Sequence, residues 1–136
     1  MAIHHLWDIR EIYSNEDGSI QFIELFSASA NQEFLSGVTL VSTNTDTTII
    51  HTYRFPSNSG TPTDGHSLLL ATPGFAALPG GITPDYEIPF DFLFTAGGNL
   101  NFNSVTDLDY GPPPLIALPT DGVNSLNINA TWYYHC

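Results

Sequence analysis

The segment Ser19–Phe26, SIQFIELF, decides the fold class of this 136-residue chain. Polar and apolar residues alternate along it, and β-branched and aromatic types dominate, which is typical of a β-strand. Ile23 and Leu25 would share one face of that strand. The other face would carry Ile20, Phe22, Glu24 and Phe26. Because both faces are largely apolar, we expect a loop, a terminal segment or another subunit to cover the second face.

The residues on either side of this segment predict its pairing. The cluster SNEDG precedes it, and Gly18 can take the positive φ that a hairpin turn requires, so Leu6–Tyr13 and Ser19–Phe26 should pair. After a polar loop, the segment Phe34–Leu40 (FLSGVTL) predicts a return of the chain as a second hairpin.

The rest of the chain continues as short strands separated by Gly, Pro, Asn and Ser. The segment Thr72–Pro79 predicts the one helical turn, with Thr72 as its cap and Pro73 in its first position. We therefore expect an all-β, immunoglobulin-like sandwich of about eight to ten short antiparallel strands. The further predicted strands are Leu35–Ser42, Thr48–Phe55, His66–Ala71, Tyr86–Ile88, Phe90–Phe94, Asn99–Phe102, Val105–Tyr110 as an edge strand, and Leu126–Tyr134.

Length and charge limit the classes of partner. A chain of this length predicts a single domain over residues 1–136, with segments 1–13 and 124–136 as interaction strands. The net charge of −12, with Arg10 and Arg54 as the strong cations, argues against nucleic acid and anionic membrane surfaces. No apolar run approaches the roughly 18 residues of a membrane span. Cys136 is the single cysteine, so no internal disulfide is expected, and a disulfide to another chain is the minority alternative.

Several segments in this order resemble the lamin-tail domain, above all its bacterial extracellular form. The resemblance covers about residues 6–128 and implies an immunoglobulin-like, non-catalytic interaction module, located outside the cell or at its surface. No signal peptide is visible in the chain itself. The segments are Gln21–Leu25, Leu35–Gly37 with Leu40, Phe55–Pro56, Leu68–Ala71, Thr72–Gly80, Pro84–Tyr86 and Leu118–Gly122.

Two acidic turns carry oxygen ligands of the type that Ca²⁺ accepts. They are Asn15 with Asp17, and Asp107 with Asp109. Neither stretch completes a known calcium-loop pattern. The structural alternatives are an ordinary hairpin turn for the first and, for the second, an edge strand whose like charges discourage unwanted pairing.

Soft metal ligands cluster only at the two ends of the chain. His4, His5, His135 and Cys136 would bind Zn²⁺ or Cu if the terminal strands lay side by side, and otherwise they are surface residues. We interpret His51, on the apolar face of its strand, as a hydrogen-bonded core or subsurface histidine. Glu24, between two phenylalanines, should pin the N–H groups of a neighbouring loop.

Aromatic residues provide a second kind of candidate site. Trp7, Trp132, Tyr133 and Tyr134 would form either a carbohydrate-stacking platform, an interface anchor, or a core with a strand edge. For catalysis the sequence offers little: G-x-S-x-G, H-E-x-x-H and the nucleotide-binding glycine patterns are absent.

The leading hypothesis is a non-enzymatic, extracellular interaction module that binds protein. It would associate with copies of itself in a surface layer or filament, using strand addition or apolar faces. The interaction residues that we predict are Ile20, Phe22, Phe26, Trp7, Trp132 and Tyr134. The alternatives are a glycan-binding module that uses exposed aromatics and a small secreted hydrolase.

Overall fold

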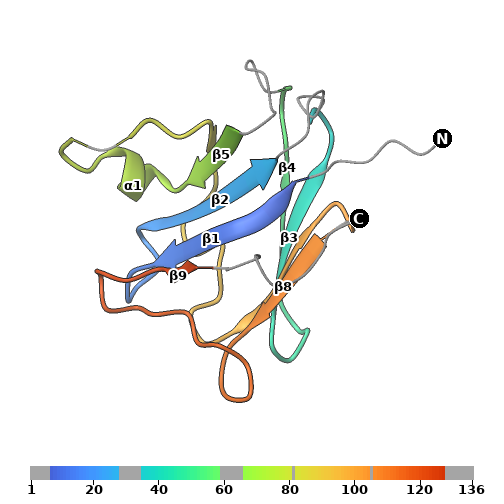
Figure 1. The fold of residues 1–136 in the computed structure, drawn as a ribbon, viewed down its shortest axis with the longest axis vertical. Helices are drawn as coiled ribbons and strands as arrows, with labels where there is room; N and C mark the ends of the chain where they lie inside the picture. The colour runs from blue at the N-terminus through green and yellow to red at the C-terminus, as the bar shows by residue number, and fades with distance from the viewer. Residues whose placement is uncertain (1–6, 28–34, 59–65, 81, 105, 128–136) are drawn as a thin grey trace.

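The computed structural model describes residues 7–27, 35–58, 66–80, 82–104 and 106–127. They form two β-sheets packed as a sandwich (Figure 1), which confirms the predicted all-β class. The first sheet has the strand order β6-β5-β2-β1-β9 and the second the order β4-β3-β7-β8. The strands are β1 (Asp8–Ser14), β2 (Gln21–Ser27), β3 (Thr39–Asn44), β4 (Ile50–Arg54), β5 (His66–Ala71), β6 (Tyr86–Glu87), β7 (Gly98–Phe102), β8 (Thr106–Tyr110) and β9 (Leu126–Asn127), and the one described helix is α1 (Pro73–Ala76).

The strand predicted over Ser19–Phe26 lies in the middle of the first sheet. β2 pairs antiparallel with β1 and with β5, so the predicted β1–β2 hairpin is confirmed. Along β2, inward-facing and outward-facing side chains alternate between buried and half-buried. A bulge between Ile9 and Glu11 shifts the β1 register by one residue. The bulge lets Ile9 and Ile12 both face the core although they are three residues apart.

Side chains from both sheets and from the connecting segments form one hydrophobic core. Ile23 and Leu25 from β2 are completely buried in it, as are Leu40 from β3 and Leu100 from β7. Phe55 makes edge-to-face contacts with the rings of Tyr86 and Phe102, which come from opposite sheets. This apolar contact between sheets is the main stabilising interaction of the fold.

The predicted hairpin return after β2 is wrong. β3 does not pair with β2; it lies in the second sheet, between β4 and β7. The buried residues Leu35 and Val38 precede β3 and anchor the crossing between the two layers. Two strands that are adjacent in sequence therefore belong to different sheets.

The predicted strand over Phe90–Phe94 is also wrong, although Phe92 and Leu93 are buried. None of the described strands pairs with this segment, and Asp91 takes a positive φ of 59° that ends any extended run. The backbone of Leu93 pairs instead with a side chain: its N–H donates to Gln21 Oε1 and its C=O accepts from Gln21 Nε2, both at 2.9 Å. The hairpin that follows joins β7 to β8, with β8 at the predicted edge.

Other predicted elements agree closely with the structure. β5 has the predicted bounds His66–Ala71, and α1 begins after Thr72 with a proline in its first turn. β5 and β6 pair in parallel, so the expectation of purely antiparallel strands is wrong at this pair. β9 confirms only the start of the strand predicted over Leu126–Tyr134, because residues 128–136 lie outside the described residues.

Candidate functional site

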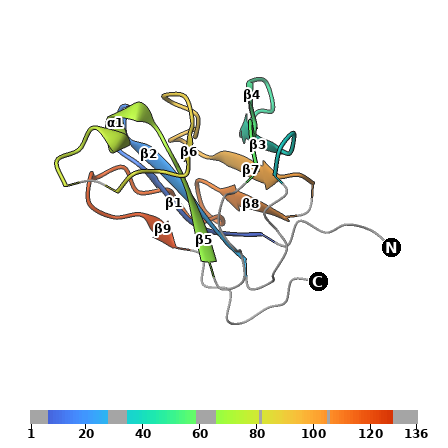
Figure 2. The same cartoon turned by 90° about the horizontal axis from the view of Figure 1, so that it is seen from above.

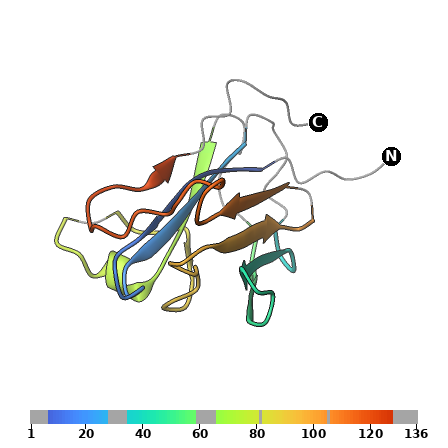
Figure 3. The same ribbon diagram turned by 90° about the horizontal axis from the view of Figure 1, so that it is seen from below.

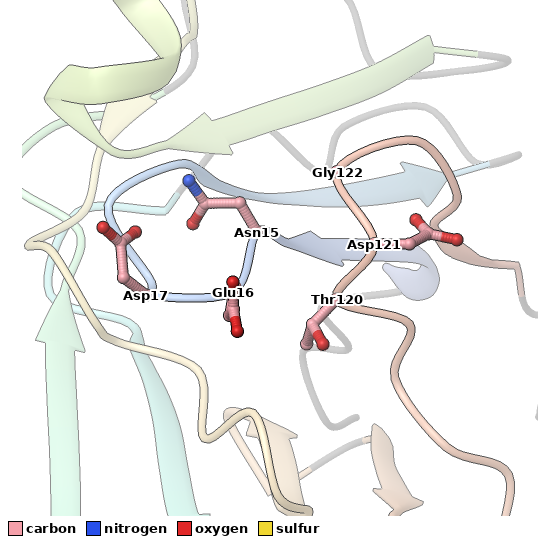
Figure 4. Close-up of a pocket in the computed structure, with 6 residues that line it drawn as sticks. All are labelled: Asn15, Glu16, Asp17, Thr120, Asp121 and Gly122. Carbon is pink, nitrogen blue, oxygen red and sulfur yellow. The ribbon is translucent and has the colours of Figure 1, made fainter.

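The predicted acidic turn lies beside a loop from the other end of the chain. The turn between β1 and β2 contributes Asn15, Glu16 and Asp17 to an open hollow of about 370 Å³ (Figure 4). The opposite wall consists of Thr120, Asp121 and Gly122. The pairing of β9 with β1 holds this loop next to the hairpin turn.

Two of the carboxylates that line this hollow, Asp17 and Asp121, accept hydrogen bonds within their own turns. Asp17 accepts hydrogen bonds from the N–H and hydroxyl of Ser19, at 3.0 and 2.7 Å, and these bonds lower the pKa of Asp17. Asp121 accepts from the N–H groups of Asn124 and Val123, both at 2.8 Å, and these bonds lower the pKa of Asp121. Both residues act as turn-capping acceptors.

The orientation of these side chains does not create a cation cage. In Figure 4 the carboxylates of Asp17 and Asp121 point away from each other. Within the described ranges no three His, Cys, Asp or Glu side chains gather in a way that could hold a metal ion. For Asn15 and Asp17, the geometry agrees with the ordinary hairpin turn. Sequence reasoning missed Asp121, because its approach to the turn depends on a pairing between chain ends.

The second calcium candidate, Asp107 with Asp109, lies on the edge strand β8 and is hydrogen-bonded to β7. The side-chain amide of Asn99 on β7 donates to Asp107 Oδ2 at 2.9 Å and to Asp109 Oδ1 at 2.8 Å. Both carboxylates lie on the solvent face of β8 and are exposed. They agree with the structural alternative, a charged edge strand.

His51 is the histidine whose side chain the structure describes. Its Nδ1 lies 3.0 Å from the carbonyl oxygen of Phe92, so Nδ1 donates the proton, and its ring stacks on Phe94 at 4.6 Å. This confirms the predicted hydrogen-bonded histidine. Phe94 also lines a second open hollow of about 370 Å³, together with exposed Asp46 and Asp91.

One of the four aromatic candidates is buried, and the other three lie outside the described residues. Trp7 is 1% exposed and belongs to the core, so its predicted role in a glycan platform or interface is corrected. Trp7 packs in the hydrophobic cluster, which confirms for this residue the predicted core alternative. Trp132, Tyr133 and Tyr134 lie outside the described residues, as do the candidate metal ligands His4, His5, His135 and Cys136.

The outward face of β2 is covered largely by this chain. Phe22 stacks on Tyr13 at 5.3 Å and meets the edge of Phe75 at 5.4 Å, and Figure 3 shows α1 beside the β1–β2 turn. The guanidinium of Arg10 lies 3.8 Å above the ring of Phe26. Phe22, Phe26 and the predicted interaction residue Ile20 are therefore half-buried. A cation–π contact and an aromatic stack thus supply part of the cover that the sequence led us to expect on this face. The predicted role of Ile20, Phe22 and Phe26 in binding stays a prediction.

Glu24 differs from its predicted role. It is half-buried on the outward face of β2, opposite Glu11 on β1. In the described part of the chain its carboxylate receives no hydrogen bond from a loop N–H. The prediction failed because the nearby acceptor that binds a loop is Glu11, which accepts from the Ser125 hydroxyl.

Comparison with protein families, curated proteins and solved structures finds no match to this chain. The resemblance to the lamin-tail domain stays a prediction. Among the described residues no helix is long and apolar enough to cross a membrane.

The remaining candidate is an open sheet edge at β4. β4 is the end strand of the second sheet (Figure 2), and no described strand pairs with its outer side. Ile49 and Ile50 are 49% and 61% exposed at its start. A free edge with exposed β-branched residues is a surface that can accept another strand.

Proposed function

We propose that this chain is a non-enzymatic β-sandwich module that acts by binding protein, and that it associates with copies of itself through a free sheet edge. The proposal places the chain outside the cell, as the resemblance to bacterial lamin-tail domains implies. The observation that supports it is the open edge of β4, five residues long and bearing exposed Ile50.

The other three sheet edges are less suited to strand addition. β6 and β9 are two residues long in the described part of the chain, and β8 carries the exposed pair Asp107 and Asp109. Short strands and charged side chains are two of the ways in which proteins block edge pairing. β4 is longer than β6 and β9, and it carries the cation Arg54 but no carboxylate. In an acidic chain these features favour strand addition at β4 over the other three edges.

Sedimentation equilibrium and light scattering on the purified full chain test this proposal. We expect reversible, concentration-dependent association between about 1 μM and about 1 mM, the range of transient protein contacts. A single monomeric species over that whole range, at both low and moderate salt, would exclude self-association.

A further inference from the structure

The hydrogen bonds of the second sheet show which β4 groups face outward. Phe55 N–H donates to Val38 C=O at 2.9 Å, and Asn44 N–H donates to Ile49 C=O at 3.1 Å. In an antiparallel ladder, bonded residues alternate along each strand, so odd-numbered β4 residues bond to β3. On the other side of β3, Asn103 N–H donates to Thr39 C=O at 2.9 Å, as the same alternation requires.

Three residues therefore present free backbone groups along the outer side of β4. These are Ile50, Thr52 and Arg54, and all three side chains are exposed. Each carries one N–H and one C=O directed away from β3. The described residues supply no partner for these groups, so water or another strand must satisfy them.

The distribution of carboxylates among the edge strands favours β4 as the edge at which two acidic copies can meet. No carboxylate occurs between Asp46 and Asp64, and the same interval contains Arg54, one of two strong cations. In contrast, β8 carries two aspartates and β6 carries Glu87. Glu87 acts electrostatically on Tyr53 of β4, but β4 itself contributes no carboxylate. Two copies with a net charge of −12 each therefore meet less repulsion between their paired strands at β4 than at β8.

The sequence of β4, IHTYR, can pair with itself without placing like charges opposite each other. In the antiparallel register centred on Thr52, the two Thr52 residues face one another. Ile50 then lies opposite Arg54 of the second copy, and His51 lies opposite Tyr53. This register uses the whole strand. It also pairs residues whose backbone N–H and C=O groups point outward with residues of the same kind, as hydrogen-bonded pairs require.

We infer that the partner of this edge is a second copy of the chain, joined by a two-fold axis at Thr52. The two four-stranded sheets become one continuous sheet through about six new backbone hydrogen bonds, two at each facing pair. The exposed side chain of Ile50 packs along the aliphatic stem of the facing Arg54. This inference rests on the proposed self-association and adds to it the interface, the symmetry and the register.

The decisive experiment uses the charge variants Thr52→Lys and Thr52→Asp of the full chain. The two-fold axis places each new charge against its own copy, so each variant alone should dimerise roughly fivefold more weakly than the unmodified chain. An equimolar mixture should regain the affinity, because Lys then faces Asp. Sedimentation equilibrium measures all three samples. If the mixture is no stronger than either variant alone, the two-fold register is wrong.

A second pair of variants tests the edge without added charge. Thr52→Pro removes an outward N–H and no bond to β3, so the fold should persist while dimerisation weakens at least about tenfold. Asp107→Pro is the matched control, because the same alternation directs its N–H outward on β8. Circular dichroism checks that both variants fold.

These experiments distinguish the β4 interface from self-association through another surface. If the chain associates and both proline variants associate equally well, the interface lies elsewhere and only the inference fails. If the unmodified chain remains monomeric throughout, both fail.

Discussion

At the scale of single residues, the side chain of Gln21 joins the start of β2 to the segment 90–94. Its buried side-chain amide pairs with both backbone groups of Leu93 and donates to Ser14 Oγ at 3.0 Å. This amide replaces the strand pairing that residues 90–94 lack, which is why that segment can lie in the core without belonging to a sheet.

Truncation of Gln21 should therefore cost far more than truncation of a buried serine. Gln21→Ala leaves the buried N–H and C=O of Leu93 unpaired, and we expect a loss of roughly 2–4 kcal/mol in the free energy of unfolding. Ser42→Ala is the control, because the buried Ser42 hydroxyl has no hydrogen-bond partner in the described structure. Its removal should leave stability unchanged or raise it by up to about 1 kcal/mol in urea unfolding. Equal losses in the two variants would contradict the role assigned to Gln21.

Tyr110 gives the fold a dependence on alkaline pH. Its buried hydroxyl accepts a hydrogen bond from the N–H of Phe94 at 3.2 Å, and burial raises the pKa of Tyr110 to about 12 from an ordinary value near 10. The folded protein therefore holds this proton more tightly than the unfolded chain. The corresponding stabilisation is complete below about pH 10 and is lost as the pH rises through about 12.

The measurement compares the free energy of unfolding of the unmodified chain with that of Tyr110→Phe from pH 9 to pH 12. Relative to the variant, the unmodified chain should lose about 2–3 kcal/mol over this range. A difference that stays constant with pH would show that the Tyr110 phenol titrates alike in the folded and unfolded states.

At the scale of elements, the capping residue of α1, Thr72, attaches this helix to the start of β2 through its hydroxyl and its backbone N–H, which donates to Gln21 C=O at 3.0 Å. Thr72 Oγ1 accepts from Gln21 N–H at 3.0 Å and donates to Ser19 C=O at 2.9 Å, and it also accepts from Phe75 N–H at 3.4 Å. The same residue therefore caps the helix and bonds the start of β2. This attachment holds Phe75 against Phe22 and covers the outward face of the central strand.

Thr72→Val keeps the shape of the side chain and removes the hydrogen bonds of its hydroxyl. We expect it to destabilise the fold by roughly 2–4 kcal/mol, since Thr72 is fully buried and the groups it serves lose their partner. Thr72→Ser retains the hydroxyl and should cost about 1 kcal/mol from the lost methyl group. Thermal unfolding of both variants measures the difference, and near-equal losses would indicate that packing, not hydrogen bonding, fixes α1.

The elements that sequence predicts well are those whose signals are local. The uninterrupted run over β5 and the Thr-Pro start of α1 each depend on adjacent residues, and both appear with their predicted bounds or start. The position of β3 depends on which layer the chain enters after its loop, and no adjacent residue encodes that choice. Residues 90–94 have the composition of a strand, but the amide of Gln21, distant in sequence, occupies their backbone.

The same distinction applies to the candidate sites. The Asn15–Asp17 turn is visible in the sequence because the side chains of Asn15 and Asp17 bond to Ser19 and Ile20, a few residues away. Its approach to Asp121, in contrast, requires the β1–β9 pairing. The free edge of β4 is a property of strand order. Sequence predicted β4 as a strand but could not show that its outer side would have no neighbour.

At the scale of the whole molecule, the net charge of −12 opposes any association between copies. Because β4 is free of carboxylates, the repulsion at a two-fold β4 interface comes from charges elsewhere on each copy. Charges separated by more than a Debye length are screened, and that length falls from about 30 Å at 0.01 M salt to about 8 Å at 0.15 M. Dimerisation should therefore strengthen with salt, by something on the order of tenfold over this range.

Sedimentation equilibrium at several sodium chloride concentrations measures this dependence, with Thr52→Pro as the variant in which association should stay weak at every concentration. The sign of the dependence also distinguishes two arrangements of the sheet. If the β4 edge of one copy met the β8 edge of the next, Arg54 would lie near Asp107 and Asp109, and screening of that attraction would weaken association as salt increased. A head-to-tail contact of this kind would propagate into a filament, whereas the two-fold contact uses up both β4 edges and closes at a pair.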